Sequence, residues 1–457
     1  MFGTSGIRGE VGEEVTADVA LSVGRALASE GYDRVVVGRD TRESGTMLAD
    51  ALSAGVRECG ADVVRLGTAA TPTVARSVGW LDADAGVAVT ASHNPPADNG
   101  LKLWTPSGRA FDGQQRDEIA RRVHQGAYAL ASAGEVGSES EWEGGTGRHV
   151  AALREATGSL DGLHAVVDVG NGAGRLTATA LDELGCSVTT LHAEPDGSFP
   201  GRPSEPTAET CTKLCRLVEH TDAHFGVAHD GDADRTMAVT GEGEFVPGDL
   251  LLALFGRACA GAGERVAAPL NTSLAVDDAL ADVGASVVRT KVGDTYVAER
   301  VADDDVAFGG EPSGAWIWPG ETRCPDGPLA ACRLAELVRD HGPLGAQLDG
   351  IGGYVTRRES REAEAKSEVV RRVHREAVAT YDTVDVSDGV RVDVDDGWFL
   401  VRASGTQPLV RVTAEAEDAG RADELFEAAS ELVADARAGE SSGPEPEAAA
   451  VGDRSDD

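Results

Sequence analysis

The sequence has little lysine and no long apolar run. Only four of its 41 basic residues are lysines, against 78 acidic residues, and the formal net charge is -37. Such an acidic chain repels nucleic acid and anionic membrane surfaces. No stretch of 18 apolar residues is present, which argues against a membrane-spanning helix. Residues 1–2 lead directly into a glycine-rich motif, which leaves no space for a signal peptide. We therefore expect a cytoplasmic protein that binds neither nucleic acid nor membranes.

The shortage of lysine has a second consequence. An acidic excess with 37 arginines and only four lysines is typical of proteins in the cytoplasm of salt-accumulating halophiles. At about 1 M salt the Debye length is only about 3 Å. The global negative charge then does not exclude an anionic ligand that local basic residues hold. The alternative interpretation is an acidic surface in an ordinary cytoplasm.

Cysteines are also few, and their positions along the chain suggest no disulfide pairs. Seven scattered cysteines indicate reduced thiols. Cys211 and Cys215 are four residues apart on an expected helix, but no other thiol or histidine pair completes a metal site with them. We interpret them as core or surface residues.

Short apolar strands alternate with helical patterns over the first three quarters of the chain. Strands are expected at 34–38, 62–66, 85–89, 165–169, 187–191, 225–228, 265–269, 286–290 and 306–308, with helices at 16–30, 45–59, 73–80 and 112–125. Alternation of this kind predicts doubly wound sheets. Residues 131–147 are rich in Gly, Ser and Glu and indicate a linker. We expect three mixed, mostly parallel α/β domains, at 1–145, 146–243 and 244–348, which form a structural repeat.

The last quarter follows a different pattern. A strand at 353–358 and a helix at 362–380 precede an antiparallel group at 390–394, 398–403 and 409–414, and a helix follows at 419–436. This order predicts a smaller α+β domain at 349–437. Residues 438–457 are dominated by Gly, Ser, Pro, Glu, Ala and Asp, a composition that predicts disorder.

Ser92 lies in the motif TASHNP at residues 90–95, directly after an expected strand. Chemistry in α/β folds often occurs at strand ends. A serine hydroxyl is a poor nucleophile and needs activation. The adjacent His93 need not face it. The alternative is a simple turn, because Ser, Asn and Pro are common in turns for backbone reasons.

Three carboxylates follow the strand at 225–228. Asp230, Asp232 and Asp234 alternate along a loop and can converge on one hard cation. An EF-hand is not expected, because a glycine falls inside the triplet and loop position 12 is Gly241. Three carboxylates leave room for a phosphate oxygen, as magnesium sites do.

Two further loops are rich in glycine. Residues 170–174 (GNGAG) lack the G-x-G-x-x-G spacing of dinucleotide sites, so we expect a structural turn. Residues 310–314 (GEPSG) end one expected strand and Lys291 ends the preceding one. Both lie at the same edge of a parallel sheet, where ligands bind.

Five motifs, in this order, resemble the α-D-phosphohexomutase family of phosphoglucomutases, phosphomannomutases and phosphoglucosamine mutases. They are residues 3–9 (GTSGIRG), 90–95 (the serine loop), 230–235 (DGDADR, the metal loop), 310–314 (the sugar loop) and 402–408 (RASGTQP, the phosphate loop). The resemblance spans roughly residues 2 to 437. It implies an isomerase that moves a phosphoryl group between the 6- and 1-positions of a hexose, through a phosphoserine enzyme and a bisphosphorylated sugar.

The resemblance also implies a role for each residue near the serine. Ser92 carries the phosphate and, with Asp230, Asp232 and Asp234, holds Mg²⁺. Lys102 and Arg8 lie beside it, and a buried lysine with a lowered pKa can transfer protons. His93 and Arg235 orient the phosphate.

The substrate side of the site follows from the same resemblance. Glu311 and Ser313 bind sugar hydroxyls, beside Lys291. One clamp serves whichever phosphate is not reacting. Its residues are Arg402, Ser404, Gly405 and Thr406. The expected partners are a phosphorylated hexose or hexosamine and a hexose bisphosphate, bound by a monomer or homodimer.

Two departures bear on the sugar. Ala315-Trp316 follows the sugar loop where many bacterial members have a histidine, and Gln407 replaces a common glutamate. The Glu-Pro-Ser-Gly form of the sugar loop is most similar to archaeal phosphoglucosamine mutases. We therefore expect conversion of glucosamine 6-phosphate to glucosamine 1-phosphate. A phosphomannomutase or phosphoglucomutase is the alternative, followed by a phosphoserine-dependent phosphatase and a non-catalytic sugar-phosphate sensor.

Overall fold

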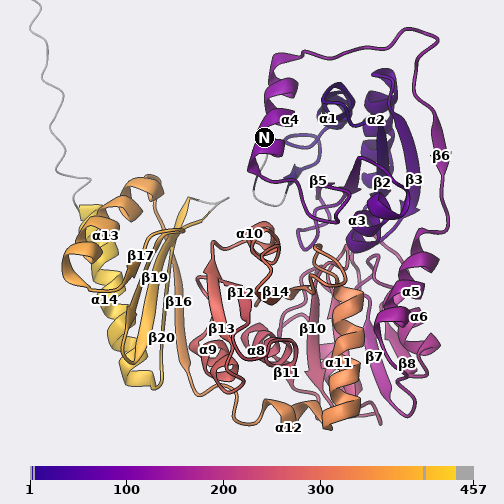
Figure 1. Ribbon diagram of the computed structural model, residues 1–457. Helices are drawn as coiled ribbons and strands as arrows, with labels where there is room; N and C mark the ends of the chain where they lie inside the picture. The colour runs from indigo at the N-terminus through magenta and orange to yellow at the C-terminus, as the bar shows by residue number, and fades with distance from the viewer. Residues whose placement is uncertain (1–2, 4–5, 405–407, 439–457) are drawn as a thin grey trace, which may run out of the picture. The chain divides into compact units, whose positions relative to one another are not determined.

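The computed structural model describes residues 3, 6–404 and 408–438 (Figure 1). It divides into one compact unit up to Gly352 and a second from Gly353. Several predicted positions lie outside the described residues: Thr4 and Ser5 of the first motif, Gly405, Thr406 and Gln407 of the phosphate loop, and residues 439–457 of the predicted disordered tail. Within the described part, no helix has the length and apolar character needed to cross a membrane.

The first sheet has six strands in the order β1-β5-β4-β2-β3-β6. They are β1 (Ile7–Glu10), β2 (Arg34–Arg39), β3 (Asp62–Thr68), β4 (Ala85–Val89), β5 (Asp98–Trp104) and β6 (Glu139–Glu141), with helices α1 (Ala17–Ser29), α2 (Gly45–Glu58), α3 (Thr71–Trp80) and α4 (Gly113–Gln125). Val35 and Val37 pack in one apolar cluster with α1 and α2, whereas Val36 packs in another with α3. Coverage of both faces explains why three consecutive valines, Val35 to Val37, form the buried middle of β2.

Helices α1 and α2 approach closely because glycines line their contact. A Cβ added at Gly24 would lie 2.2 Å from the carbonyl oxygen of Leu52, and one added at Gly55 would lie 2.1 Å from that of Leu21. Each helix therefore brings a bare backbone against the backbone of its neighbour.

The second and third sheets repeat part of this plan. The second contains β7 (His164–Asp168), β8 (Ser187–Leu191), β9 (Phe225–His229), β10 (Thr236–Thr240) and β11 (Phe245–Val246), with helices α5 (Gly145–Ala156), α6 (Leu176–Glu183) and α7 (Thr212–Glu219). The third contains β12 (Arg265–Pro269), β13 (Ser286–Thr290), β14 (Val306–Glu311) and β15 (Ala315–Ile317), with α8 (Gly248–Cys259), α9 (Leu274–Ala281), α10 (Asp294–Arg300), α11 (Gly327–His341) and α12 (Leu344–Leu348). The two share one large apolar core.

All three sheets contain the same four-strand arrangement. Its members are β3-β2-β4-β5, β8-β7-β9-β10 and β13-β12-β14-β15. In each, the second strand pairs in parallel with both neighbours, and the fourth is antiparallel to the third. The expected structural repeat is therefore present as topology. The serine, metal and sugar loops each join the third strand to the fourth, so they are equivalent positions.

The second unit is a five-stranded antiparallel sheet in the order β16-β20-β19-β18-β17. Its strands are β16 (Val355–Glu362), β17 (Val384–Asp385), β18 (Val390–Val394), β19 (Gly397–Ala403) and β20 (Leu409–Ala416), and its helices are α13 (Lys366–Thr380) and α14 (Ala419–Ala438). Alternate residues such as Phe399 and Val401 pack with both helices, which lie side by side next to the sheet (Figure 1).

The predicted fold class is confirmed, three mixed α/β sheets with helices followed by an antiparallel α+β part. Some local expectations were wrong. The proposed linker contains β6, which pairs in parallel with β3, although all three of its residues are exposed and carry no apolar signal. Residue 362 ends β16, and the helix expected to begin there starts at Lys366.

Candidate active site

Ser92 occupies a strained position directly beyond β4. Its backbone φ of 54° lies in the left-handed region, which a residue with a Cβ rarely adopts. Its amide N–H donates to Thr90 Oγ1 (2.8 Å). Its side chain is buried, and Oγ donates to Asp230 Oδ2 at 2.5 Å. The serine loop thus directs the hydroxyl at the metal loop.

The three aspartates converge as the sequence predicts. All three are buried, and they offer carboxylate oxygens within 4.8 Å of one another. The turn between them places Ala233 at a φ of 56°. Burial, followed by the charges of Asp232 and Asp234, raises the pKa of Asp230. Asp232 Oδ1 and Asp234 Oδ1 are buried without a hydrogen-bond donor among the described residues. Hard oxygen ligands with unused lone pairs fit Mg²⁺.

Lys102 pairs with these carboxylates from the neighbouring strand. The β4–β5 register places Ala88 opposite Lys102, and Lys102 Nζ donates to Asp232 Oδ2 at 3.0 Å and to Asp234 Oδ2. Burial acts to lower the pKa of Lys102, but the two carboxylates outweigh it, and the pKa is raised. The lowered pKa that we expected is therefore absent from this arrangement, in which Lys102 is a firmly held cation.

Other positive groups surround the serine. Arg8 lies on β1 opposite Gly100. Arg235 donates its amide N–H to Asp230 Oδ1 (3.2 Å), and its side chain reaches Glu205 at 3.6 Å. Burial, then the charges of Arg235, Arg8 and Lys102, lower the pKa of His93 to about 2. His93 is therefore a neutral imidazole in a locally cationic setting, despite the acidic chain.

The sugar loop adjoins the metal loop through β15. Thr236 N–H donates to the carbonyl of Gly314 (2.9 Å). Trp316 is fully buried and donates from Nε1 to the carbonyl of Thr236 (2.8 Å). Trp316, one of the two residues that stand where many bacterial members have a histidine, therefore connects β15, which follows the sugar loop, to the start of β10, which follows the metal loop.

Glu311 is buried at the end of β14. Its Oε1 accepts from Gly293 N–H (2.7 Å), and its Oε2 accepts from Ser313 Oγ (3.3 Å). Burial, followed by the negative charge of Asp294, raises the pKa of Glu311 to about 7. The exposed Lys291 places its ammonium 5.5 Å from the ring centre of Tyr296. These residues form one cluster at the carboxyl ends of β13 and β14.

The described part of the phosphate loop belongs to the second unit. Arg402 Nη1 lies 3.6 Å from Asp388 Oδ2. Ser404 is buried, donates its N–H to Leu409 O, and accepts at its carbonyl from Lys366 Nζ (2.6 Å). Gly405 and Thr406 lie outside the described residues. Of the predicted clamp residues, the structure therefore describes Arg402 and Ser404, and their contacts lie within the second unit.

Several polar residues around the serine and metal loops were not predicted from the sequence. Thr71 at the start of α3 donates from N–H and Oγ1 to Asp232 (2.9 and 2.6 Å). Ser204 Oγ donates to Ser92 O (2.8 Å). Asp40 and Arg42 lie behind the serine loop. Asp40 and Arg42 immediately follow β2, the strand beside β4, and that shared edge was the available signal.

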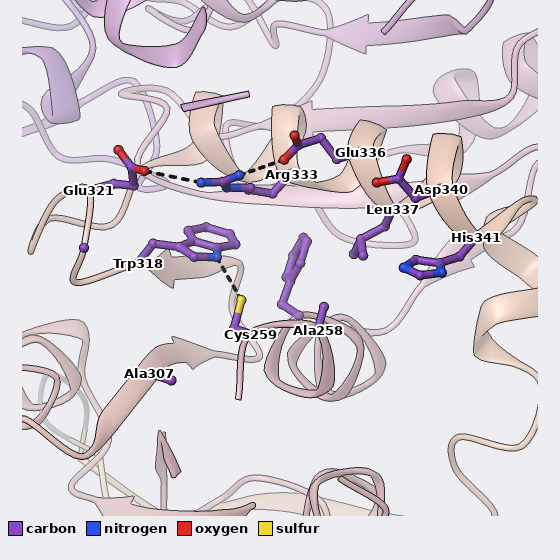
Figure 2. Close-up of a pocket in the computed structure, with 12 residues that line it drawn as sticks. Ala258, Cys259, Ala307, Trp318, Glu321, Arg333, Glu336, Leu337, Asp340 and His341 are labelled. Carbon is purple, nitrogen blue, oxygen red and sulfur yellow. Dashed lines mark hydrogen bonds and ion pairs between the residues drawn. The ribbon is translucent and has the colours of Figure 1, made fainter. Parts of the chain in front are cut away.

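A cavity of about 510 Å³ lies elsewhere in the first unit, between α8, α11 and the segment after β15. Figure 2 shows Arg333 between Glu321 and Glu336, with Trp318 donating to Cys259 below. None of its lining residues belongs to the serine, metal or sugar loop. The cavity is therefore separate from the candidate active site.

Models of one family cover the chain almost continuously. Phosphoglucomutase/phosphomannomutase alpha/beta/alpha domain I matches residues 1–129, domain II residues 148–243, domain III residues 247–351, and the C-terminal domain residues 355–432.

Individual proteins agree with the family models. A protein of Methanopyrus kandleri named probable phosphoglucosamine mutase is 45% identical over 93% of this chain and 95% of its own length. One of Methanosarcina barkeri with the same name is 41% identical over 95% of this chain and 99% of its own. The crystal structure of a phosphoglucomutase/phosphomannomutase family protein from Burkholderia thailandensis has a TM-score of 0.85 and 28% identity, covering 96% of this chain and 99% of that one.

Proposed function

Because the chain belongs to the phosphoglucomutase/phosphomannomutase family, and is therefore a phosphohexomutase, we propose that it interconverts glucosamine 6-phosphate and glucosamine 1-phosphate. Archaeal proteins 39–45% identical to it carry the name probable phosphoglucosamine mutase. Their names support glucosamine phosphate as the substrate, but they do not say which residues of this chain select that sugar.

One local observation carries the preference for an amino sugar. Glu311 and the neighbouring Asp294 interact closely enough for the charge of Asp294 to raise the pKa of Glu311. A buried carboxylate beside a partly exposed one stabilises a cation placed between them. Glucosamine phosphate brings an ammonium group, which mannose and glucose phosphates lack. The sugar loop of this chain therefore favours the hexosamine.

The proposed reaction uses Ser92 as the phosphoryl carrier. The phosphoryl group of phosphorylated Ser92 moves to the free hydroxyl oxygen of the sugar phosphate. The bond from phosphorus to Ser92 Oγ breaks, the proton of that hydroxyl passes by way of Lys102 to Ser92 Oγ, and the bisphosphorylated sugar results. The phosphoryl group at the other end then returns to Ser92 Oγ. Phosphoryl transfer depends mainly on positioning and charge neutralisation.

The surrounding residues divide this work. Arg8 and Arg235 provide fixed positive charge beside the transferred group, and neutral His93 orients it. Lys102 stays our proposed proton carrier. Its raised pKa keeps it protonated, so it gives a proton to the leaving oxygen while it takes one from the attacking hydroxyl. Asp230, Asp232, Asp234 and an oxygen on Ser92 would hold Mg²⁺, which withdraws charge from the phosphoryl group when bound.

The proposal extends to the substrate-binding groups and the setting. Glu311, Ser313 and Lys291 bind the sugar, and the phosphate loop, from Arg402 to Thr406, clamps the phosphate that is not reacting. A hexose bisphosphate acts as intermediate and activator. We also propose that the protein acts in the cytoplasm of a halophile, as a monomer or a homodimer.

A comparison of three substrates tests this function. The kcat/KM values for glucosamine, mannose and glucose 6-phosphates should be measured side by side in saline buffer, with Asp294→Asn and, as control, Asp304→Asn, whose side chain is exposed. We expect wild type to prefer glucosamine 6-phosphate, and Asp294→Asn alone to reduce that preference. A preference for mannose or glucose phosphate would contradict the hexosamine assignment. Phosphate released to water, with none retained on the sugar, would indicate a phosphatase.

A further inference from the structure

We propose that Arg42 is a positioning residue for phosphoryl transfer, which, together with Asp40, fixes the backbone of Ser92 from behind. This inference rests on the proposed role of Ser92 as phosphoryl carrier and adds a residue to its support. Arg42 belongs to no motif that points to chemistry by itself. It lies three residues beyond the end of β2, and β2 pairs in parallel with β4, the strand that leads into the serine loop.

The guanidinium of Arg42 is fully buried, with 0% of its side chain exposed. Nε donates to Asp40 Oδ2 at 3.0 Å, within an ion pair whose acid is equally buried. A buried charge is costly unless it is paired and every donor has an acceptor. The ring of Phe199 lies 5.0 Å from the guanidinium carbon. The site therefore meets the conditions under which an arginine is retained inside a protein.

The other four donors of Arg42 bind the serine loop and its continuation. Nη2 donates to the carbonyls of Ser92 (2.9 Å) and Asn94 (2.7 Å). Nη1 donates to those of Pro95 (2.5 Å) and Asp98 (2.8 Å). Four carbonyls from seven consecutive residues thus point at one planar group. This loop has no regular ladder of its own, and Arg42 supplies it with a common centre.

Asp40 completes the arrangement. Its Oδ1 accepts from the amide N–H of Arg42 (2.9 Å), and its Oδ2 accepts from Thr90 Oγ1 (2.6 Å). Thr90 Oγ1 in turn accepts from the amide N–H of Ser92 (2.8 Å). The backbone of Ser92 is therefore fixed at both ends, its N–H through Thr90 and Asp40 and its carbonyl through Arg42.

This fixation has a direct consequence for the hydroxyl. Ser92 has a φ of 54°, which a non-glycine residue keeps only when its surroundings hold it there. Its carbonyl also accepts from Ser204 Oγ (2.8 Å) of the second domain. With both carbonyl contacts made, Oγ lies 2.5 Å from Asp230 Oδ2. Loss of the guanidinium frees four carbonyls and allows the loop to relax toward an ordinary φ, which redirects Oγ.

Arg42→Lys tests the proposal without removing the charge. A lysine ammonium has three donors and no planar fork, so it cannot reproduce the five contacts. We expect a folded protein with kcat reduced about 100-fold, the loss that a misplacement of about 1 Å can cause. The KM for the sugar phosphate should change less than about threefold, because Arg42 does not face the substrate.

A second variant separates positioning from folding. Arg42→Ala should lose more activity, and guanidinium ions at millimolar concentration should restore part of its kcat. Arg65→Ala is the matched control, since Arg65 lies in the same domain and binds Ala49 O, Ser53 Oγ and Asp50 on α2. Its activity should not respond to guanidinium. If Arg42→Ala does not fold, Asp40→Asn, which keeps the volume but removes the ion pair, takes its place in the kcat comparison.

The decisive readout is the rate at which Ser92 takes up phosphate from a hexose bisphosphate, followed by intact mass. Wild type should be labelled quickly and Arg42→Lys slowly, with equal thermal stability within a few degrees. A folded Arg42→Lys enzyme with wild-type kcat and labelling rate would overturn the positioning role. A wild type that is neither labelled nor active on any sugar phosphate would instead refute the proposed function, and this inference with it.

Discussion

The metal loop and the sugar loop both bury carboxylates, but their neighbours balance the charge differently. Asp232 and Asp234 meet the ammonium of Lys102. Glu311 lies near both Asp294 and Arg235 but has no lysine or arginine in an ion pair with it among the described residues, and its pKa rises to about 7 chiefly through burial. In the metal loop two carboxylate oxygens have no hydrogen-bond donor within the described part of the chain. We therefore expect a divalent cation to complete the metal loop, whereas burial brings the pKa of the sugar-loop carboxyl of Glu311 to about 7.

Removal of a metal-loop carboxylate should have the largest effect on the difference between the two loops. Asp230→Asn should reduce kcat by about 10²–10³-fold, because several kcal/mol of charge stabilisation depend on the cation. Its unfolding free energy should change little or rise, because three clustered carboxylates repel one another without the ion. Steady-state kinetics and thermal melts check both expectations.

Chelation provides the matching control. Excess chelator should stop wild-type turnover and added Mg²⁺ should restore it, with no comparable effect on the fold. Full activity in excess chelator would reject the metal site. An Asp230→Asn protein that loses stability in proportion to activity would indicate a purely structural loop.

Removal of the clamp arginine should have the next largest effect. Arg402→Ala removes a charged hydrogen-bonding group, which typically costs about 1.5–3 kcal/mol, or roughly 10- to 150-fold in affinity. We propose that one clamp serves both substrate orientations, and on that proposal binding of the 1-phosphate and of the 6-phosphate should weaken together. High salt will reduce the effect if the loop is open to solvent. Measurement of KM and kcat in both directions decides the point, and a loss confined to one direction would show that Arg402 contacts one substrate end only.

The smallest expected effect concerns pH at the sugar loop. Glu311 has a raised pKa, so between about pH 4.5 and 7 the folded protein binds more protons there than the unfolded chain. Its contribution to stability therefore falls as pH rises through this window. Ionised Glu311 is the better partner for an ammonium, so KM for glucosamine 6-phosphate should fall over the same window.

Glu311→Gln sharpens this prediction, because it keeps the shape and removes the titration. Its KM and its melting temperature should each lose the component that changes between about pH 4.5 and 7. Identical pH profiles for wild type and variant would mean that Glu311 does not titrate in this range.

The positions of the serine, metal and sugar loops could be predicted because each follows an apolar strand with a distinctive motif. The pairing of Lys102 with Asp232 and Asp234 could not, since it depends on the register of β5 against β4 and on the meeting of two sheets. The same limit hid Arg42. An arginine just beyond a strand has the pattern of a surface residue, and its burial is set by four carbonyls that come from another part of the chain.

The short strands β1 and β6 were not predicted, for a different reason. β6 has no buried residue, and β1 has only four residues, two of them Gly9 and Glu10. Their places are set by pairing with β3 and β5 rather than by an apolar pattern of their own.

We propose above all that Ser92 carries the phosphoryl group between the two ends of the sugar. Its most direct test is the intact mass of wild type and of Ser92→Ala after incubation with a hexose bisphosphate, with turnover measured on the same samples. The account predicts one added phosphate on wild type, mapped to Ser92 and removed by glucosamine 6-phosphate, and neither labelling nor turnover for a folded Ser92→Ala. Near-normal turnover by Ser92→Ala, or an active wild type that never carries phosphate on Ser92, would contradict it.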